Sequence, residues 1–169
     1  IKKIKLKLEK KCNNLIIEFA PMYLRIYENW ERAISYHQGD WVMFLCEDDL
    51  IYFGAIQNLE NMIKKYKNLN CFFWNTSSYS YNHDNGILKV AKETYATKAK
   101  LKIFKSKDVL RKIFKDNSVH KVKRDLPYIP GCLIKSKIIK KTNNNFFFNE
   151  EPMWASAFQV LNSEKNYMR

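Results

Sequence analysis

The chain has 169 residues, the usual length of one domain, and 46% of them are hydrophobic and 15% aromatic. This composition excludes global disorder, and only four glycines and four prolines exclude a loop-dominated, low-complexity chain. The net charge is +13, which attracts nucleic acid, anionic lipid or a diphosphate substrate. Because the lysines are spread among many asparagines and isoleucines, an AT-rich genome would give the same balance, and charge alone does not choose between these partners.

The start of the sequence predicts neither a signal peptide nor a membrane anchor. It opens with Ile1 and a highly charged segment that no small-residue cleavage site follows. We therefore expect the sequence to begin inside a longer protein. The longest uncharged apolar run, residues 50–56, is far shorter than the ~18 residues of a membrane-spanning helix. The four cysteines are scattered without a CxxC pair, as expected of free thiols in a reducing cytoplasm.

The first forty residues predict two helices with a short strand between them. Residues 1–14 have the apolar spacing of an amphipathic helix, and residues 15–19 are apolar and β-branched enough for a strand that Pro21 ends. Residues 28–37 again place apolar side chains one helical turn apart. Gly39 is expected to end this second helix as its C-cap glycine.

The next segment alternates between strand and helix. The six apolar residues at 41–46, WVMFLC, predict a buried strand of a parallel sheet, and an acidic turn at 47–49 follows. Residues 56–66 then have helical spacing, and residues 71–74 predict a second buried strand. This alternation implies parallel strands joined by right-handed crossovers. We therefore predict a single α/β domain spanning residues 1–169, with a mostly parallel sheet flanked by helices.

The second half of the sequence is expected to hold a loop or hairpin tip over residues 76–105, with Asn85-Gly86 as its turn. Ser106 is expected to cap a helix that carries apolar residues at 109–114. The basic, proline-punctuated stretch 119–131 predicts a mobile loop. The chain then closes with a strand over residues 146–148 and a helix that has Pro152 in its first turn.

The acidic turn carries the strongest chemical signal. Glu47, Asp48 and Asp49 follow a predicted buried strand, and ligands of open parallel sheets bind outside the carboxyl ends of the strands. A divalent cation would relieve the repulsion between adjacent carboxylates, and Mg²⁺ and Mn²⁺ prefer oxygen ligands shared with substrate phosphates. Alternatively, the acids form a solvated loop or complement the dipole of the next helix. The residues alone leave both interpretations open.

The segment 27–59 resembles the middle of family 2 glycosyltransferases, which have the GT-A fold. In that family a helix with an Asn-Trp-Glu-like sequence and an alanine precedes a turn into a strand, and the strand ends in a DxD-type acidic motif. A helix beginning near a Gly/Pro-Ala pair follows. The corresponding residues are Asn29-Trp30-Glu31, Ala33, Gly39-Asp40-Trp41-Val42, Glu47-Asp48-Asp49 and Gly54-Ala55.

Two later segments also resemble this family. In residues 126–142, Gly131 precedes a strand and a basic helix start, as in the acceptor-side region of transferases that build bacterial surface polysaccharides. Residues 146–158 resemble the helix that carries the family's catalytic acid. The family's amino-terminal strand and base-binding loop have no counterpart here. The resemblance therefore implies the central and carboxyl-terminal part of a Rossmann-like GT-A domain that is incomplete at the amino terminus.

The resemblance implies a role for each acid. Asp49 would bind Mn²⁺ or Mg²⁺ on the sugar-nucleotide diphosphate, and the cation would neutralise charge on the departing nucleoside diphosphate. Glu47 and Asp48 would contact this metal through water, or the ribose and the donor sugar. A carboxylate at the start of the last helix would take the proton from the acceptor hydroxyl, and the anomeric carbon would be inverted.

Two departures from the family pattern affect these roles. Glu47 replaces the first Asp of the motif, and Met153 stands where related sequences often have an acid. Glu151 and Glu150 are then the candidate catalytic bases, or else carboxylates that the helix dipole stabilises. Trp154 adjoins them and is a candidate sugar-binding residue, with core packing as the alternative. Gly131 is the remaining candidate substrate contact.

The resemblance predicts a hexosyltransferase-like enzyme that transfers a sugar from a nucleotide donor, a UDP-sugar, to a saccharide or lipid-linked acceptor. We expect it in bacterial surface polysaccharide synthesis, in the cytoplasm, with peripheral contact to the inner face of the membrane as an option and no nucleic-acid partner. Two alternatives stay open. The chain is a non-catalytic basic module that binds nucleic acid or an anionic surface, or it is an inactive remnant of the GT-A fold.

Overall fold

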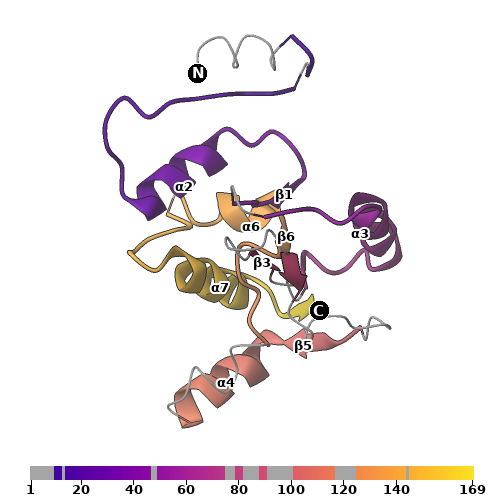
Figure 1. Cartoon of the computed structure of the whole chain (residues 1–169). Coiled ribbons are helices and arrows are strands. Elements are labelled where there is room, and N and C mark those ends of the chain that lie inside the picture. Colours follow the sequence, from indigo (N-terminus) through magenta and orange to yellow (C-terminus); the bar gives the residue numbers. More distant parts are fainter. Residues whose placement is uncertain are drawn as a thin grey trace.

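The structure is a computed structural model, and it describes residues 10–12, 14–46, 49–74, 79–81, 88–90, 101–116, 125–143 and 145–169. The described part is a mixed α/β protein with an open five-stranded sheet that helices flank (Figure 1). Glu47 and Asp48 lie outside the described residues, as does most of the amphipathic helix expected over residues 1–14. No helix of the described part is long and apolar enough to span a bilayer.

The described elements follow one another along the chain with short strands and longer helices. Strands β3 and β4 pair only with each other, and all the other strands belong to the main sheet. In chain order the elements are α2 (Ile26–Ser35), β1 (Trp41–Met43), α3 (Ala55–Lys65), β2 (Cys71–Phe73), β3 (Tyr79–Tyr81), β4 (Leu88–Val90), β5 (Ile103–Lys105), α4 (Ser106–Asp116), β6 (Cys132–Lys135), α6 (Ser136–Lys140), α7 (Pro152–Ser163) and β7 (Asn166–Met168).

The main sheet has the order β1-β6-β2-β7-β5. Strand β6 lies between β1 and β2 and is antiparallel to both, with Val42 opposite Ile134 and Phe72 opposite Leu133. Strands β1 and β2 therefore point the same way, as expected for two strands joined through a helix. The β2–β7 pair is parallel and the β5–β7 pair antiparallel. The expected mostly parallel pairing is thus wrong for the described strands, because β6 comes from far along the chain and separates β1 from β2.

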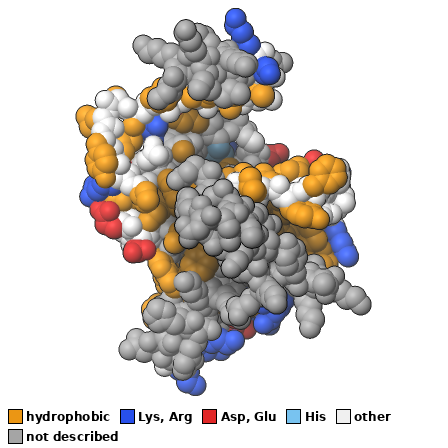
Figure 2. All heavy atoms as spheres, viewed as in Figure 1, with side chains coloured by type: hydrophobic (Ala, Val, Ile, Leu, Met, Phe, Trp, Pro, Cys, Tyr) orange, Lys and Arg blue, Asp and Glu red, His pale blue; other side chains and the backbone are white. Residues whose placement is uncertain are grey.

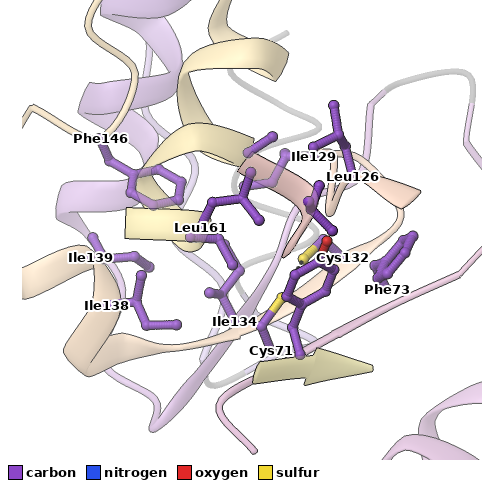
Figure 3. Packing of buried hydrophobic residues seen from close by; sticks show 14 of the residues in the cluster. Cys71, Phe73, Leu126, Ile129, Cys132, Ile134, Ile138, Ile139, Phe146 and Leu161 are labelled. Atoms are coloured by element: carbon purple, nitrogen blue, oxygen red, sulfur yellow. Dashed lines mark hydrogen bonds between the residues drawn. The ribbon is translucent and has the colours of Figure 1, made fainter. Parts of the chain in front are cut away.

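Alternate strand residues face opposite sides of the sheet, and each side has its own apolar cluster. On one side α2, α4, α6 and α7 contribute to a cluster that includes Cys71, Phe73, Cys132 and Ile134 (Figure 3). On the other side, side chains of α3 pack against a smaller cluster. Its strand members are Phe72, Leu133 and Met168, and its α3 members are Leu59, Met62 and Ile63.

Strand β1 is shorter and more exposed than its apolar sequence predicts. It spans three residues, all half-buried, and it forms the edge of the described sheet, since β6 is its single partner there. The following residues, 44–46, are not part of the strand. The expectation of a buried six-residue strand is therefore wrong. A continuous apolar run does not distinguish a central strand from an edge strand whose chain then leaves the sheet to pack elsewhere.

Three helices and one strand confirm the sequence predictions. Helices α2 and α3 lie within two residues of their predicted bounds, and α7 has Pro152 at its first position. Of the predicted apolar faces, Ala33 and Ile56 are exposed, and His37 lies beyond the end of α2. Strand β2 is fully buried, as expected. Strands β3 and β4 confirm a hairpin in the middle segment, with Tyr79 opposite Val90; its turn, including Asn85-Gly86, lies outside the described residues.

Two predicted strands are wrong, and one predicted loop has a buried part. Residues 15–19 form no strand, and Ile16 and Phe19 are each about half exposed. Residues 146–148 form no strand either, although Phe146 and Phe147 are completely buried. Of the predicted loop 119–131, residues 119–124 lie outside the described residues. Residues 126–131 form no helix or strand, as predicted, but they are largely buried because their apolar side chains join the core.

Two predicted caps are also wrong. Helix α2 ends at Ser35, and its C-cap is Tyr36, whose backbone has the right-handed helical conformation. Gly39 is not among the described glycines with positive φ. Ser106 is the first residue of α4, and its hydroxyl donates a hydrogen bond to the carbonyl of Glu164. Glycine and serine are common cap residues, but the residue type alone does not show at which residue a helix begins or ends.

Candidate functional site

The candidate site lies at the end of the sheet where β1 and β2 finish and β6 begins. Met43, at the end of β1, faces Leu133, and Phe73, at the end of β2, faces Cys132. Just beyond, the backbone amide of Trp74 donates to the carbonyl of Gly131 over 3.0 Å. Gly131 is buried and has φ of 93°, a conformation that glycine adopts without strain. The acidic turn after β1 and the segment before β6 thus leave the same end of the sheet.

Asp49 is the one member of the acidic trio that lies among the described residues. Its carboxylate Oδ2 accepts a hydrogen bond from the amide of Cys46 at 2.8 Å, and its own amide donates to the carbonyl of Cys46 at 3.1 Å. These two bonds close a turn and hold the half-buried Asp49 side chain over it. In the described residues no three His, Cys, Asp or Glu side chains gather as a metal site. The metal role of Asp49 and Glu47 therefore stays a prediction.

An aromatic cluster joins the exit from β1, which leads to the acidic turn, to the segment that leads into α7. Trp30 of α2, Phe44 after β1 and Phe147 before α7 contact one another pairwise, with ring centroids 5.2 to 5.8 Å apart. The Phe44–Phe147 and Trp30–Phe147 pairs are edge-to-face, the arrangement that the aromatic quadrupole favours. Helix α2 therefore packs against both segments that carry candidate site residues.

Polar contacts from α2 reinforce this packing. The Oε2 atom of Glu31 accepts a hydrogen bond from the backbone amide of Phe147 at 2.8 Å. Its Oε1 atom is buried and has no hydrogen-bond partner among the described residues. At the start of α2, the Arg25 guanidinium contacts Glu28 at 2.8 Å and Glu150 at 3.1 Å. The hydrogen bonds from Arg25 lower the pKa of the Glu28 carboxyl.

The two candidate bases differ in their surroundings. The Glu150 side chain is exposed but lies in the ion pair with Arg25. Glu151 is also exposed and is the N-cap residue of α7, yet its carboxylate makes no capping hydrogen bond, and its amide donates to Asn149 Oδ1 at 3.0 Å. Met153, at the position where related sequences often carry an acid, is exposed. The geometry therefore leaves Glu151 as the carboxylate less engaged with the protein.

Trp154 packs against a residue to which the sequence assigned no role. Its ring meets that of Tyr128 edge-on, with centroids 5.2 Å apart, and both rings pack on the core. The Tyr128 hydroxyl is buried without a hydrogen-bond partner among the described residues, and burial raises the pKa of Tyr128 to about 12. Because Tyr128 lies three residues before Gly131, the start of α7 lies close to the start of β6. The packing role of Trp154 is clear, and its sugar-binding role stays a prediction.

The surface beside the site is apolar and shallow. Directly after Asp49, the side chains of Leu50, Tyr52 and Phe53 are more than 80% exposed. Figure 2 shows apolar side chains on the surface of this face, including the right of the view, where α3 lies. A hollow of about 230 Å³ between α2 and β1 is lined by His37 and residues 42–45, among others. It is smaller than the ~300–1,000 Å³ of typical small-molecule pockets.

No protein-family model matches the chain, and no curated protein matches it. The sites just described therefore support a function through their own chemistry and through the resemblance carried by residues 27–59 and 126–158. Sequence analysis missed Glu31, Arg25 and Tyr128 as members of this region. The Asn29-Trp30-Glu31 stretch was the one signal, and it marked a helix of the family pattern without indicating what its side chains contact.

Proposed function

We propose that this chain forms part of a metal-dependent, inverting glycosyltransferase of the GT-A type. It transfers a sugar from a UDP-sugar to a saccharide or lipid-linked acceptor. The observation that carries the proposal is the convergence of three segments at one end of the sheet. The acidic turn follows β1, and Gly131 precedes β6. The segment that leads into α7 contacts the exit from β1 through the Phe147–Phe44 pair, and Trp154 of α7 contacts Tyr128, three residues before Gly131.

The acidic turn has the chemistry that a divalent cation and a diphosphate require. The half-buried carboxylate of Asp49 is fixed by the amide of Cys46, and carboxylate oxygens suit Mn²⁺ and Mg²⁺. Asp49 would hold the cation together with Glu47, and Asp48 would contact the donor. When bound, the cation supplies a positive charge that stabilises the departing UDP. The bonds from the Cys46 turn orient Asp49 before any ligand arrives, which reduces the entropy lost on binding.

The acceptor half of the reaction falls to the start of α7. Glu151 accepts the proton of the acceptor hydroxyl. The hydroxyl oxygen forms a bond to the anomeric carbon, and the bond from that carbon to the diphosphate breaks. Glu150 is held by Arg25 and serves to order this segment. Trp154 would offer its half-buried ring to the acceptor sugar. Leu50, Tyr52 and Phe53 beside Asp49 are exposed and favour an acceptor with a lipid part, because removing apolar side chains from water lowers the free energy.

Calorimetry and turnover test the proposal together. We expect the chain to bind UDP weakly, through the diphosphate and only in the presence of Mn²⁺, and to lose that binding in Asp49→Asn. Glu151→Gln should keep the binding, with turnover of UDP-sugar reduced by ~100-fold or more. Mn²⁺-dependent UDP binding without any turnover would favour the inactive remnant. Salt-sensitive binding to nucleic acid without a response to UDP would favour the basic module and contradict the proposal.

A further inference from the structure

Helix α2 holds together two segments that lie more than one hundred residues apart in the sequence. One is the exit from β1, which leads through Phe44 to Asp49. The other is the segment 146–148, in which Phe146 and Phe147 are buried and which leads to Glu151 at the start of α7. Trp30 contacts both Phe44 and Phe147, and Glu31, the next residue of the helix, binds the backbone of Phe147. Two neighbouring side chains of α2 therefore link both segments.

The Glu31 contact replaces the hydrogen bonds that a strand would supply. Phe146 and Phe147 are buried but belong to no strand, so the amide of Phe147 needs a partner from a side chain. The carboxylate of Glu31 provides it at 2.8 Å. The second oxygen of Glu31, Oε1, is buried without a partner among the described residues, an arrangement that is unfavourable for stability. A side chain held in an unfavourable state at such a junction suggests a role beyond packing.

We propose that Glu31 is a positioning residue that, together with Trp30, sets the start of α7 relative to the acidic turn. Through this contact the carboxylate of Glu151 keeps a fixed place with respect to the donor held near Asp49. The catalytic part of this inference rests on the proposed function, while the positioning part stands on the contacts of Glu31 with Phe147. The Arg25–Glu150 ion pair lies at the other end of the same junction and supports the same segment.

Hydrogen exchange tests the positioning part without any assay of activity. In Glu31→Ala the amide of Phe147 should exchange about tenfold faster or more, because it loses its acceptor. Glu31→Gln keeps a side-chain oxygen that accepts this bond and should retain protection. Glu60→Ala removes an exposed carboxylate of α3 that lies 3.9 Å from Lys64, and it should leave the exchange rate of the Phe147 amide unchanged. If Glu31→Ala does not fold, Glu31→Leu keeps the apolar volume and removes the acceptor, and serves in its place.

Steady-state kinetics test the catalytic part. In Glu31→Ala we expect kcat to fall at least ~tenfold while the affinity for UDP with Mn²⁺ changes less than ~twofold, and Glu31→Gln should restore most of the turnover. Unchanged exchange at Phe147, or an equal loss of UDP affinity and turnover, would overturn the inference. A wild-type chain without UDP binding or turnover, but with the predicted exchange pattern, would remove the proposed function and leave Glu31 as the residue that positions the start of α7.

Discussion

The carboxylate of Asp49 and the backbone amide of Cys46 form a hydrogen bond of 2.8 Å, and the Asp49 amide returns a bond to the carbonyl of Cys46. The residue expected to hold a cation is therefore also a structural member of its own turn. Mutation of Asp49 therefore combines two effects, which a comparison of alanine and asparagine variants separates. One is the loss of ligand binding, and the other is the loss of the local backbone conformation.

Replacement of Asp49 should reveal the second of these effects, the structural one. Asp49→Ala removes the acceptor for the Cys46 amide and should lower the free energy of unfolding by ~1 kcal/mol. Asp49→Asn keeps a side-chain oxygen for this bond and should lose less than half of that. Urea denaturation of the metal-free chain measures both. Equal stability of the alanine variant and the wild type would show that the turn does not depend on the side chain.

Tyr128 and Tyr167 should respond in opposite ways to loss of their hydroxyl groups. The Tyr128 hydroxyl is buried without a partner among the described residues, so Tyr128→Phe should leave stability unchanged or raise it by up to ~1 kcal/mol. The Tyr167 hydroxyl donates to the carbonyl of Asp125 at 2.7 Å, and Tyr167→Phe should lower stability by ~1–2 kcal/mol. Thermal denaturation of the two variants side by side provides the comparison. A loss of stability in Tyr128→Phe as large as in Tyr167→Phe would contradict this account.

The raised pKa of Tyr128 also predicts a loss of stability at alkaline pH. Its pKa rises from the ordinary 10.0 to about 12 because burial disfavours the phenolate. The contribution of this residue is therefore fully present below pH 10 and is lost as the pH rises through about 12. Tyr128→Phe should show a shallower fall in the free energy of unfolding across this range. An identical pH dependence in the variant and the wild type would exclude Tyr128 as its source.

Glu28 predicts a dependence on pH at the acid end. Hydrogen bonds from the side chain and the backbone of Arg25 lower its pKa from the ordinary value of 4.5. Glu28 therefore stabilises the fold above that value, and the contribution is lost as the pH falls below 4.5 through the lowered pKa. An NMR titration should place the midpoint of Glu28 below the ordinary value of 4.5. Glu28→Gln should remove this part of the acid-side loss of stability.

The aromatic cluster should carry much of the stability at the junction of α2 with the site. Phe147 is 1% exposed and contacts Trp30 and Phe44, so Phe147→Ala should lower the free energy of unfolding by ~3–5 kcal/mol. Phe114 of α4 is 77% exposed, and the same substitution there should change it by less than ~0.5 kcal/mol. Chemical denaturation measures both. Similar effects of the two substitutions would argue that Phe147 is not packed as described.

The elements that were predictable from the sequence are those whose signal is local. Helices α2, α3 and α7 show their periodicity within one or two dozen residues, and Pro152 marks the start of the last helix. The position of β6 between β1 and β2 was not predictable, because its partners lie far away in the chain and any apolar strand would satisfy the pattern. An apolar run favours burial, and it does not show which strand lies beside its residues.

The candidate site shows the same difference between local patterns and contacts between distant residues. The acidic turn, Gly131 and the start of α7 are short local patterns, and the sequence predicts each of them as part of the site. The contacts of Glu31 with Phe147 and of Arg25 with Glu150 span 116 and 125 residues, and no local pattern indicates them. Residues 146–148 illustrate the difficulty. Their apolar sequence predicted a strand, whereas a single carboxylate from α2 supplies the partner for the Phe147 amide in the folded chain.

Calorimetric titration of UDP into the chain in the presence of Mn²⁺, repeated with Asp49→Asn, tests the central claim most directly. Asp49→Asn keeps an acceptor for the Cys46 amide, so its effect reports on the cation and not on the turn. The account predicts UDP binding that requires Mn²⁺ and is lost in the variant while the fold, followed by circular dichroism, is retained. UDP binding of equal strength in both proteins, or none in the wild type with Mn²⁺ present, would contradict it.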